Sequence, residues 1–274
     1  MTSSPPERVV HLNRYYHFTE LMRDPAIEGR LRRFKSAHDG TMQTVLILQP
    51  TGEKSDKLFF FFHGMDGDSG DGVVLRDIVT RLNATVVTMG GRGPAWISDA
   101  FLADAEQVIR SHSSGFPEYY LIGISMGGTQ ALSLAGLLPH DLRRSVIGVI
   151  ALIPGANLPA ILTHSANERV RNTLRDSING DVSVLAQRSP MAVLAQYEPG
   201  LPFVIFHNHK DTLLLANELA EFVSNLRRRG HRVATFSAPG DHDFKYGNFD
   251  YQKIIEKLGS DSTEMDAPFI LDKR

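Results

Sequence analysis

A serine lies between glycines in the stretch GISMGG, residues 123–128. An apolar, β-prone run (119–122) precedes it, and a run of small and helix-forming residues (129–138) follows it. Strand, G-x-S-x-G and helix in this order are typical of a nucleophile elbow, a strained turn that presents a serine at the end of a strand. Glycines two residues before and after Ser125 remove Cβ atoms that would clash in such a turn. An ordinary turn, or a phosphate-binding turn at a helix N-terminus, could give the same short pattern.

A serine at neutral pH is a poor nucleophile, so it needs a base and an acid that orients the base. In open α/β sheets the active groups lie beyond the carboxyl ends of the strands. An expected strand at 201–208 is followed by Asp211, and an expected strand at 232–238 is followed by His242. Ser125, Asp211 and His242 therefore come in the order nucleophile, acid, base, each after its own strand.

Each of these partners has an alternative role. Asp211 precedes Thr212 and could cap the next helix, and His242 could be a histidine of a surface loop. Asp241 and Asp243 are alternative acids, but side chains of adjacent residues point apart. The joint occurrence of all three groups favours catalysis over the separate alternatives.

Two other patterns are compatible with metal ions, and neither is complete. The pattern H-x-H-x-D at 207–211 matches part of the HxHxDH motif of metallo-β-lactamase-like hydrolases, but Thr212 stands in place of the last histidine. The acidic loop 66–72 is similar to a calcium loop, but Gly70 occupies a ligand position and no bidentate glutamate follows. We therefore expect no metal and no cofactor, and we expect this loop to cap the helix that follows it.

Composition narrows the class of protein. Of the 274 residues, 42% are hydrophobic and 22% are charged, and the formal net charge is −2. These values are ordinary for a soluble globular protein, and they do not favour nucleic acid or a membrane surface as a partner. No apolar run is long enough to span a membrane, and the first residues, MTSSPPERVV, do not resemble a secretory signal. We expect a cytoplasmic protein that acts on a small molecule.

The absence of cysteine limits the chemistry further. Without cysteine there is no disulfide framework, no thiolate nucleophile and no cysteine-based metal site. The nucleophile must therefore be sought among other side chains. The sequence does not determine the oligomeric state.

Strands and helices alternate along most of the chain. Two extended runs, 31–37 and 41–49, flank Asp39-Gly40 and predict an antiparallel hairpin. The run KLFFFF at 57–62 is typical of a strand buried on both faces. Further strands are expected at 84–89, 119–124, 145–153, 201–208 and 232–238, and helices at 73–82, 97–112, 126–138, 212–229 and 249–258. This order predicts a mostly parallel sheet with helices on both faces.

We expect the whole chain, 1–274, to form a single domain. Residues 1–30 would be an N-terminal extension. The segment 156–197 interrupts the alternation and is mostly helical and polar, so we expect a small cap there, or a longer crossover. The arginines at 227–229 end a helix, where cations suit the helix dipole, so they indicate a solvated helix end and not a polyanion site.

The chain resembles the α/β-hydrolase fold family, especially its compact esterases and prolyl-oligopeptidase-like members. The resemblance covers about residues 30–260 and rests on four marks in the family's order: HGMDG at 63–67, GISMG at 123–127, NHKDT at 208–212 and GDHDF at 240–244. It implies an α/β-hydrolase fold with a mostly parallel central sheet and a short helical cap. One position departs from the family, since Asn208 stands where a glycine is usual.

The resemblance also implies roles for the three residues. Ser125 would be the nucleophile. His242 would be the general base and later the general acid, and Asp211 would hold the imidazole in the required tautomer.

Further site residues follow from the same resemblance. His63-Gly64 follow the strand after which the family places half of its oxyanion hole, so the backbone N–H groups of Met65 and Met126 would be the donors. By loop position, His63, Gly64 and Trp96 are candidate substrate contacts. Trp96 could instead be a packed surface aromatic.

These features predict a serine hydrolase that cleaves a carboxylic ester or a related acyl bond through an acyl-enzyme. An acyltransferase would use the same acyl-enzyme with another nucleophile in place of water. A noncatalytic binding protein could keep the fold, although an intact triad argues against it. The sequence does not identify the acyl group.

Overall fold

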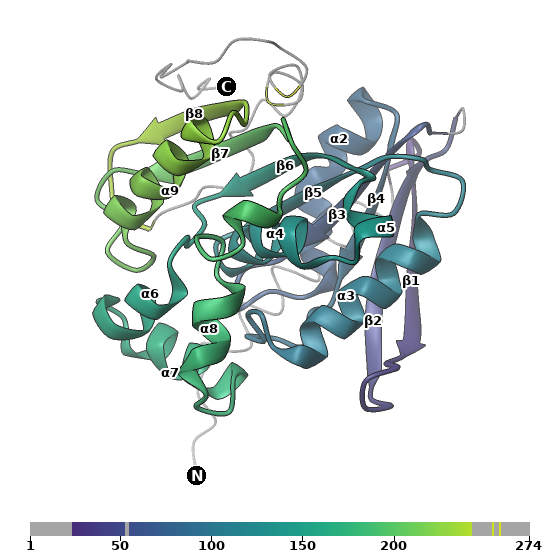
Figure 1. Ribbon diagram of the computed structural model, residues 1–274. Coiled ribbons are helices and arrows are strands. Elements are labelled where there is room, and N and C mark those ends of the chain that lie inside the picture. The colour runs from purple at the N-terminus through teal and green to yellow at the C-terminus, as the bar shows by residue number, and fades with distance from the viewer. Residues whose placement is uncertain (1–23, 53–54, 243–253, 255–257, 259–274) are drawn as a thin grey trace.

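The computed structural model describes residues 24–52, 55–242, 254 and 258. Within these residues eight strands form one sheet in the order β1-β2-β4-β3-β5-β6-β7-β8 (Figure 1). The pairs β1–β2 and β2–β4 are antiparallel, and the pairs from β4–β3 to β7–β8 are parallel. The strands are β1 (Ile27–Lys35), β2 (Met42–Pro50), β3 (Lys57–Phe62), β4 (Ala84–Met89), β5 (Tyr119–Ile124), β6 (Val146–Leu152), β7 (Phe203–Asn208) and β8 (Val233–Ala238).

Helices connect the strands and lie on both faces of the sheet (Figure 1). They are η1 (Ser69–Leu75), α2 (Arg76–Arg81), α3 (Asp99–His112), α4 (Met126–Leu137), α5 (His140–Arg143), α6 (Leu158–His164), α7 (Glu168–Ser177), α8 (Val182–Arg188), η2 (Leu194–Gln196) and α9 (Ala216–Arg228). None of the helices in the described part of the chain has the length and apolar composition that a membrane-spanning helix requires.

Strand β3 shows why helices cover both faces. Its phenylalanines are almost fully buried, as the run KLFFFF predicts. Phe60 and Phe62 contribute to a core shared with α3, α4 and α9, whereas Phe59 and Phe61 contribute to a second core with α2. Alternate side chains of one strand thus enter two hydrophobic layers, because successive side chains point to opposite faces. The predicted mostly parallel sheet with two covered faces is confirmed.

The opening hairpin is also confirmed, with different bounds. Strands β1 and β2 pair antiparallel from Ile27 opposite Pro50 to Lys35 opposite Met42. Gly40, in the connecting turn, has a φ of +75°, which glycine adopts without strain. Of the expected N-terminal extension, residues 1–23 lie outside the described part of the chain.

Two expected helices differ from the prediction. The stretch expected as one helix at 73–82 consists of a 3₁₀ helix, η1, followed by α2. The helix expected from 212 begins only at Ala216, because Leu215 has a left-handed φ of 62° that interrupts helical geometry. The last expected helix, 249–258, lies outside the described residues except for Ile254 and Leu258, which are buried in the second core.

The expected cap is present as α6, α7 and α8 between β6 and β7. These helices gather at one end of the sheet (Figure 1). They share a third hydrophobic cluster, to which Leu158, Val170 and Leu185 belong, with Trp96 and Met126. Since Trp96 and Met126 follow β4 and β5, the cap covers the carboxyl end of the sheet, where the candidate catalytic residues are expected.

A buried histidine, His231, is expected to make the stability of this fold depend on pH. His231 lies before β8 with ring centroids of Tyr197 and Phe203 at 5.8 and 5.5 Å, and burial lowers its pKa. The unfolded chain, with a histidine pKa of about 6.5, therefore binds the proton more readily than the folded chain does. We expect the free energy of unfolding to fall as the pH decreases below about 6.5, as measured by urea denaturation between pH 5 and 8.

The variant His231→Phe removes this titrating group, so its free energy of unfolding should depend less on pH than that of the wild type. The exposed His164 on α6 provides the control, because His164→Gln also removes one histidine but leaves the buried cluster intact. If the free energy of unfolding changed with pH equally in the wild type and in His231→Phe, the pH dependence would not arise from His231.

Candidate active site

Ser125 lies at the turn between β5 and α4 in a strained backbone conformation. Its φ and ψ are 54° and −119°, and its N–H donates to Leu152 O at 2.8 Å. A Cβ on Gly123 would lie 2.1 Å from Gly127 O, and a Cβ on Gly127 would lie 2.0 Å from Phe62 O. Both glycines are therefore required, as predicted. For Gly127 the obstacle is the end of β3 and not the turn itself.

The structure brings Ser125, His242 and Asp211 into one line of hydrogen bonds. Ser125 Oγ lies 2.8 Å from His242 Nε2, and His242 Nδ1 lies 2.7 Å from Asp211 Oδ2. Because an ionised carboxylate only accepts, the imidazole proton is assigned to Nδ1. Nε2 is then free to accept the proton of Ser125 Oγ, which is the arrangement that activates a serine.

The second oxygen of Asp211 has a separate task. Oδ1 accepts from the backbone N–H groups of Leu213 and Leu214 at 3.0 and 2.9 Å. Asp211 therefore does not cap α9, which begins at Ala216 after Leu215 without a side-chain cap. Its bonds close the turn before that helix and hold the carboxylate in place.

Asp241 does not occupy the position of the acid. Its Oδ1 accepts from the backbone N–H groups of Thr212 and His242 at 2.9 and 2.8 Å, and these bonds lower its pKa. The side chain thus joins the loop that carries His242 to the loop that carries Asp211. Asp243, the other alternative, lies outside the described residues.

Asn208, at the position where the family usually has glycine, joins the same two loops. It ends β7 and is 1% exposed, and its Nδ2 donates to Asp241 O. The sequence alone marks this residue only as a departure from the family. Its proximity to the loop after β8 is a consequence of the parallel pairing of β7 and β8, which ends with Asn208 opposite Ala238.

The two expected oxyanion donors are backbone groups on either side of Ser125. Met126 is the first residue of α4, where an N–H has no carbonyl of its own helix to bond. Met65 follows Gly64, and a Cβ on Gly64 would lie 3.8 Å from Ser125 Cβ, so this loop runs directly beside the serine. Among the described residues no acceptor is found for the N–H of Met65. Their role as oxyanion donors stays a prediction.

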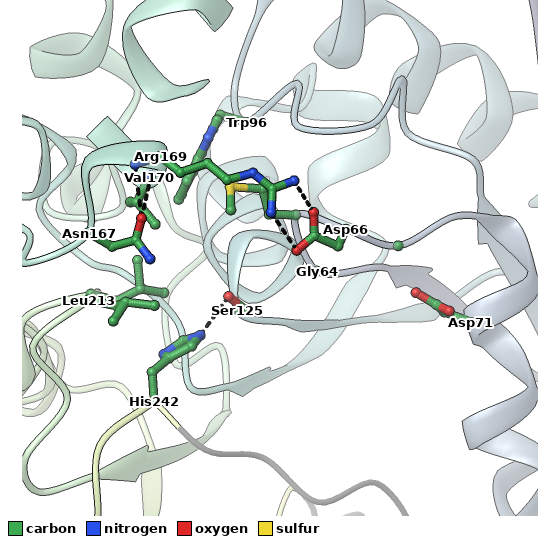
Figure 2. Close-up of a pocket in the computed structure, with 13 residues that line it drawn as sticks. Gly64, Asp66, Asp71, Trp96, Ser125, Asn167, Arg169, Val170, Leu213 and His242 are labelled. Carbon is green, nitrogen blue, oxygen red and sulfur yellow. Dashed lines mark hydrogen bonds and ion pairs between the residues drawn. The ribbon is translucent and has the colours of Figure 1, made fainter. Parts of the chain in front are cut away.

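A cavity of about 300 Å³ opens beside the serine, at the lower end of the range for small-molecule sites. Ser125 and His242 form its floor, and the loop after β3 forms one wall (Figure 2). The N-terminal part of α7 forms the opposite wall with Asn167, Arg169 and Val170.

No protein-family model matches the chain, and no curated protein matches it. Solved structures do. An acylaminoacyl peptidase of Pyrococcus horikoshii is 14% identical to this chain, with a TM-score of 0.66. The match covers 92% of this chain and 45% of the peptidase chain. The fluorophosphonate-binding serine hydrolase F of Staphylococcus aureus is 16% identical, with a TM-score of 0.68 and coverages of 86% and 99%. An esterase of Pyrobaculum calidifontis is 15% identical, with a TM-score of 0.65 and coverages of 94% and 92%.

This chain has the α/β-hydrolase fold. The likeness at these identities concerns the fold alone. The chain spans less than half the length of the acylaminoacyl peptidase but nearly the whole of the serine hydrolase and the esterase.

The side chain of Trp96 packs in the third hydrophobic cluster and also lines the cavity. It is 1% exposed and lines the cavity, and its Nε1–H donates to Thr173 Oγ1 of α7 at 3.1 Å. Gly64 also lines the cavity, and its contact with a substrate stays a prediction. The two alternatives considered for Trp96 therefore do not exclude each other.

The side chain of His63 does not reach the cavity, which corrects its assignment as a substrate contact. It is 1% exposed, with Nδ1 2.6 Å from Gly64 O and Nε2 2.9 Å from Gly90 O. The ring thus joins the loops that follow β3 and β4. Its place in the motif HGMDG is explained because the ring supports the loop after β3.

Residues of both metal-like patterns have roles in the protein's own hydrogen bonding. Asp68 accepts from Gly70 N at 2.7 Å and caps η1, as expected for the acidic loop. Asp211 of the H-x-H-x-D pattern faces His242. Within the described part of the chain no three histidine or carboxylate side chains form a group that could hold a metal ion.

The pocket residues missed from the sequence include Asn167, Arg169 and Val170 of the cap, and Leu213 and Leu214 of the loop after β7. Arg169 pairs with Asp66, which belongs to the loop after β3, so α7 is joined across the pocket to that loop (Figure 2). Both side chains are more than half exposed, so the pair contributes little stability. A polar helix offers no pattern that shows which of its residues will face a site.

Proposed function

We propose that the protein is a serine hydrolase that cleaves a carboxylic ester or a related acyl bond through an acyl-enzyme. The observation that carries the proposal is the line from Ser125 Oγ through His242 to Asp211, with distances of 2.8 and 2.7 Å. The strained φ of Ser125 supports it, because such strain is typical of functional sites. Neighbours of the same fold are described as serine hydrolases and esterases.

In the first half-reaction, Ser125 Oγ bonds to the carbonyl carbon while His242 Nε2 takes the hydroxyl proton. The carbonyl oxygen becomes an oxyanion, which the N–H groups of Met65 and Met126 would stabilise. Asp211 stabilises the imidazolium that forms. His242 then gives its proton to the departing alcohol, and the acyl group remains on Ser125.

In the second half-reaction, water replaces the alcohol. His242 takes a proton from the water as its oxygen bonds to the acyl carbon, and then returns a proton to Ser125 Oγ. The products are one carboxylic acid and one alcohol, and the enzyme regains its starting state. An alcohol or amine in place of this water would give acyl transfer at the same site.

An active-site-directed fluorophosphonate tests the nucleophile directly. We expect the reagent to form one covalent bond between phosphorus and Ser125 Oγ with loss of fluoride, because this serine lies 2.8 Å from His242 Nε2 and Asp211 holds the other side of that imidazole. Intact-protein mass spectrometry and peptide mapping would measure the adduct and its position.

Denatured protein is the control, because unfolding separates Ser125 from His242 and should abolish labelling. A folded protein that does not react, or that reacts at another serine, would favour a noncatalytic binding protein on the same fold.

A further inference from the structure

Asn167 lies at the beginning of α7 and is fixed by its own helix. Its side-chain oxygen accepts from the backbone N–H groups of Arg169 and Val170 at 2.9 and 3.3 Å. Two backbone donors at one end of the amide identify that end as Oδ1, because an NH₂ group cannot accept them. The other end is therefore the NH₂ group, and its direction is set by the cap.

The NH₂ group of Asn167 faces the cavity. Asn167 belongs to the pocket wall, and Figure 2 shows its Nδ2 turned toward the inside of the pocket. In the part of the chain that the structure describes, no protein acceptor is found for this group. The pocket thus contains a fixed hydrogen-bond donor that a substrate could use.

The position of Asn167 indicates which part of a substrate it would meet. Ala166, next to it, donates its N–H to Thr212 O at 3.2 Å, which joins this turn to the acid loop beside His242. Leu213 of that loop lies between Asn167 and His242 (Figure 2). Since His242 Nε2 must protonate the departing atom, the leaving group has to lie on the side of His242. Asn167 and Leu213 therefore border the leaving group, and Trp96 lies away from it.

We infer that Asn167 is a specificity-determining residue that donates an Nδ2–H hydrogen bond to an acceptor oxygen on the leaving group. The inference rests on the proposed function and narrows its substrate class. The preferred substrates are esters whose alcohol part carries a second oxygen (carbonyl, ether or hydroxyl), with carbon atoms that contact Leu213 and Leu214. A purely hydrocarbon alcohol leaves the amide without a partner in the complex, which costs binding energy in the transition state.

Pairs of esters with the same acyl group isolate this contact. Butyl acetate and 2-methoxyethyl acetate differ by one methylene replaced with an ether oxygen, as do pentyl acetate and 3-methoxypropyl acetate. All four form the same acetyl-enzyme, so a difference in kcat/KM arises in acylation, where the leaving group is present. The ratio of methoxyalkyl to alkyl ester in each pair is the quantity to compare.

The variants separate recognition from helix capping. Serine and aspartate cap helices about as well as asparagine, so Asn167→Ser and Asn167→Asp keep α7 but remove the amide donor. A role in capping alone predicts wild-type ratios in both variants. Recognition predicts that the ratio falls about fivefold in Asn167→Ser for at least one pair, the size of one neutral hydrogen bond. In Asn167→Asp it should fall further, because the carboxylate repels the ether oxygen.

Ester hydrolysis with unchanged ratios in both variants and both pairs would overturn the role of Asn167 and leave the proposed function standing. No turnover of any ester, together with no fluorophosphonate adduct at Ser125, would overturn both. A lowered ratio with normal far-ultraviolet circular dichroism and unchanged fluorophosphonate labelling is the result expected.

Discussion

Ser125→Ala is expected to lower kcat for small p-nitrophenyl esters by at least about 10⁴-fold, because the acyl-enzyme cannot form without Oγ. The other groups of the site act only on the bond that Oγ makes. His242 would have no serine proton to take, and with Asp211 and the N–H groups of Met65 and Met126 it could assist only direct attack by water. Steady-state hydrolysis, followed by release of p-nitrophenol, measures the effect.

The fold of Ser125→Ala should be intact, since alanine fits the same space and has the same Cβ at the φ of 54°. The exposed Ser111 on α3 provides the matched control, and Ser111→Ala should keep wild-type turnover. Retained hydrolysis in Ser125→Ala would show that the reaction does not use this serine. Adding competing alcohols to the wild type and measuring the ratio of ester to acid in the products would distinguish acyl transfer from hydrolysis.

The proximity of Ser125, Asp211 and His242 could be predicted from sequence because parallel strands convert order along the chain into proximity in space. Ser125, Asp211 and His242 each follow a strand, and β5, β6, β7 and β8 lie side by side in the sheet. The carboxyl ends of parallel strands meet at one edge, so three loops distant in sequence converge. Local patterns such as a buried apolar run and a flanking glycine were sufficient for this step.

Contacts that depend on how loops pack could not be predicted in the same way. The placement of His63 away from the cavity depends on the carbonyl of Gly90, which belongs to another loop. The orientation of Asn167 depends on where α7 begins and on which face of that helix meets Trp96. Helical spacing in a polar segment is compatible with several such orientations, and only the packed cap selects one.

A half-buried arginine holds the loop that carries Trp96. Arg92 Nε lies 2.6 Å from Oδ2 of Asp104, which is 2% exposed, and Nη1 lies 2.6 Å from Asp39 Oδ2. Ser36 Oγ adds a bond of 2.5 Å to Asp104 Oδ1. The hydrogen bond from Arg92 holds the pKa of Asp39 well below its usual range. These contacts join the hairpin turn, the loop after β4 and α3 through one guanidinium group.

Arg92→Met is expected to lower the free energy of unfolding by about 3–5 kcal/mol, because it leaves the Asp104 carboxylate buried without its countercharge. Methionine keeps most of the side-chain volume, and it bears the same backbone strain as arginine at the φ of 60°. The lowered free energy of unfolding therefore reports the loss of the positive charge and not a change in backbone strain at residue 92. Urea denaturation at pH 7 measures the free energy of unfolding, and the dependence of this free energy on urea concentration is compared between the variants.

A second substitution tests the physical cause. Asp104→Leu in the Arg92→Met background removes the stranded charge, so the double variant should be more stable than Arg92→Met alone, although it lacks both partners. Arg110 is the matched control: it also pairs with a carboxylate, that of Asp141 at 2.6 Å, but both side chains are largely exposed. Arg110→Met should leave the free energy of unfolding nearly unchanged, because solvent screens an exposed ion pair. If Arg92→Met cost as little as Arg110→Met, the cluster would be a surface ion pair and another contact would have to hold the Trp96 loop against the cap.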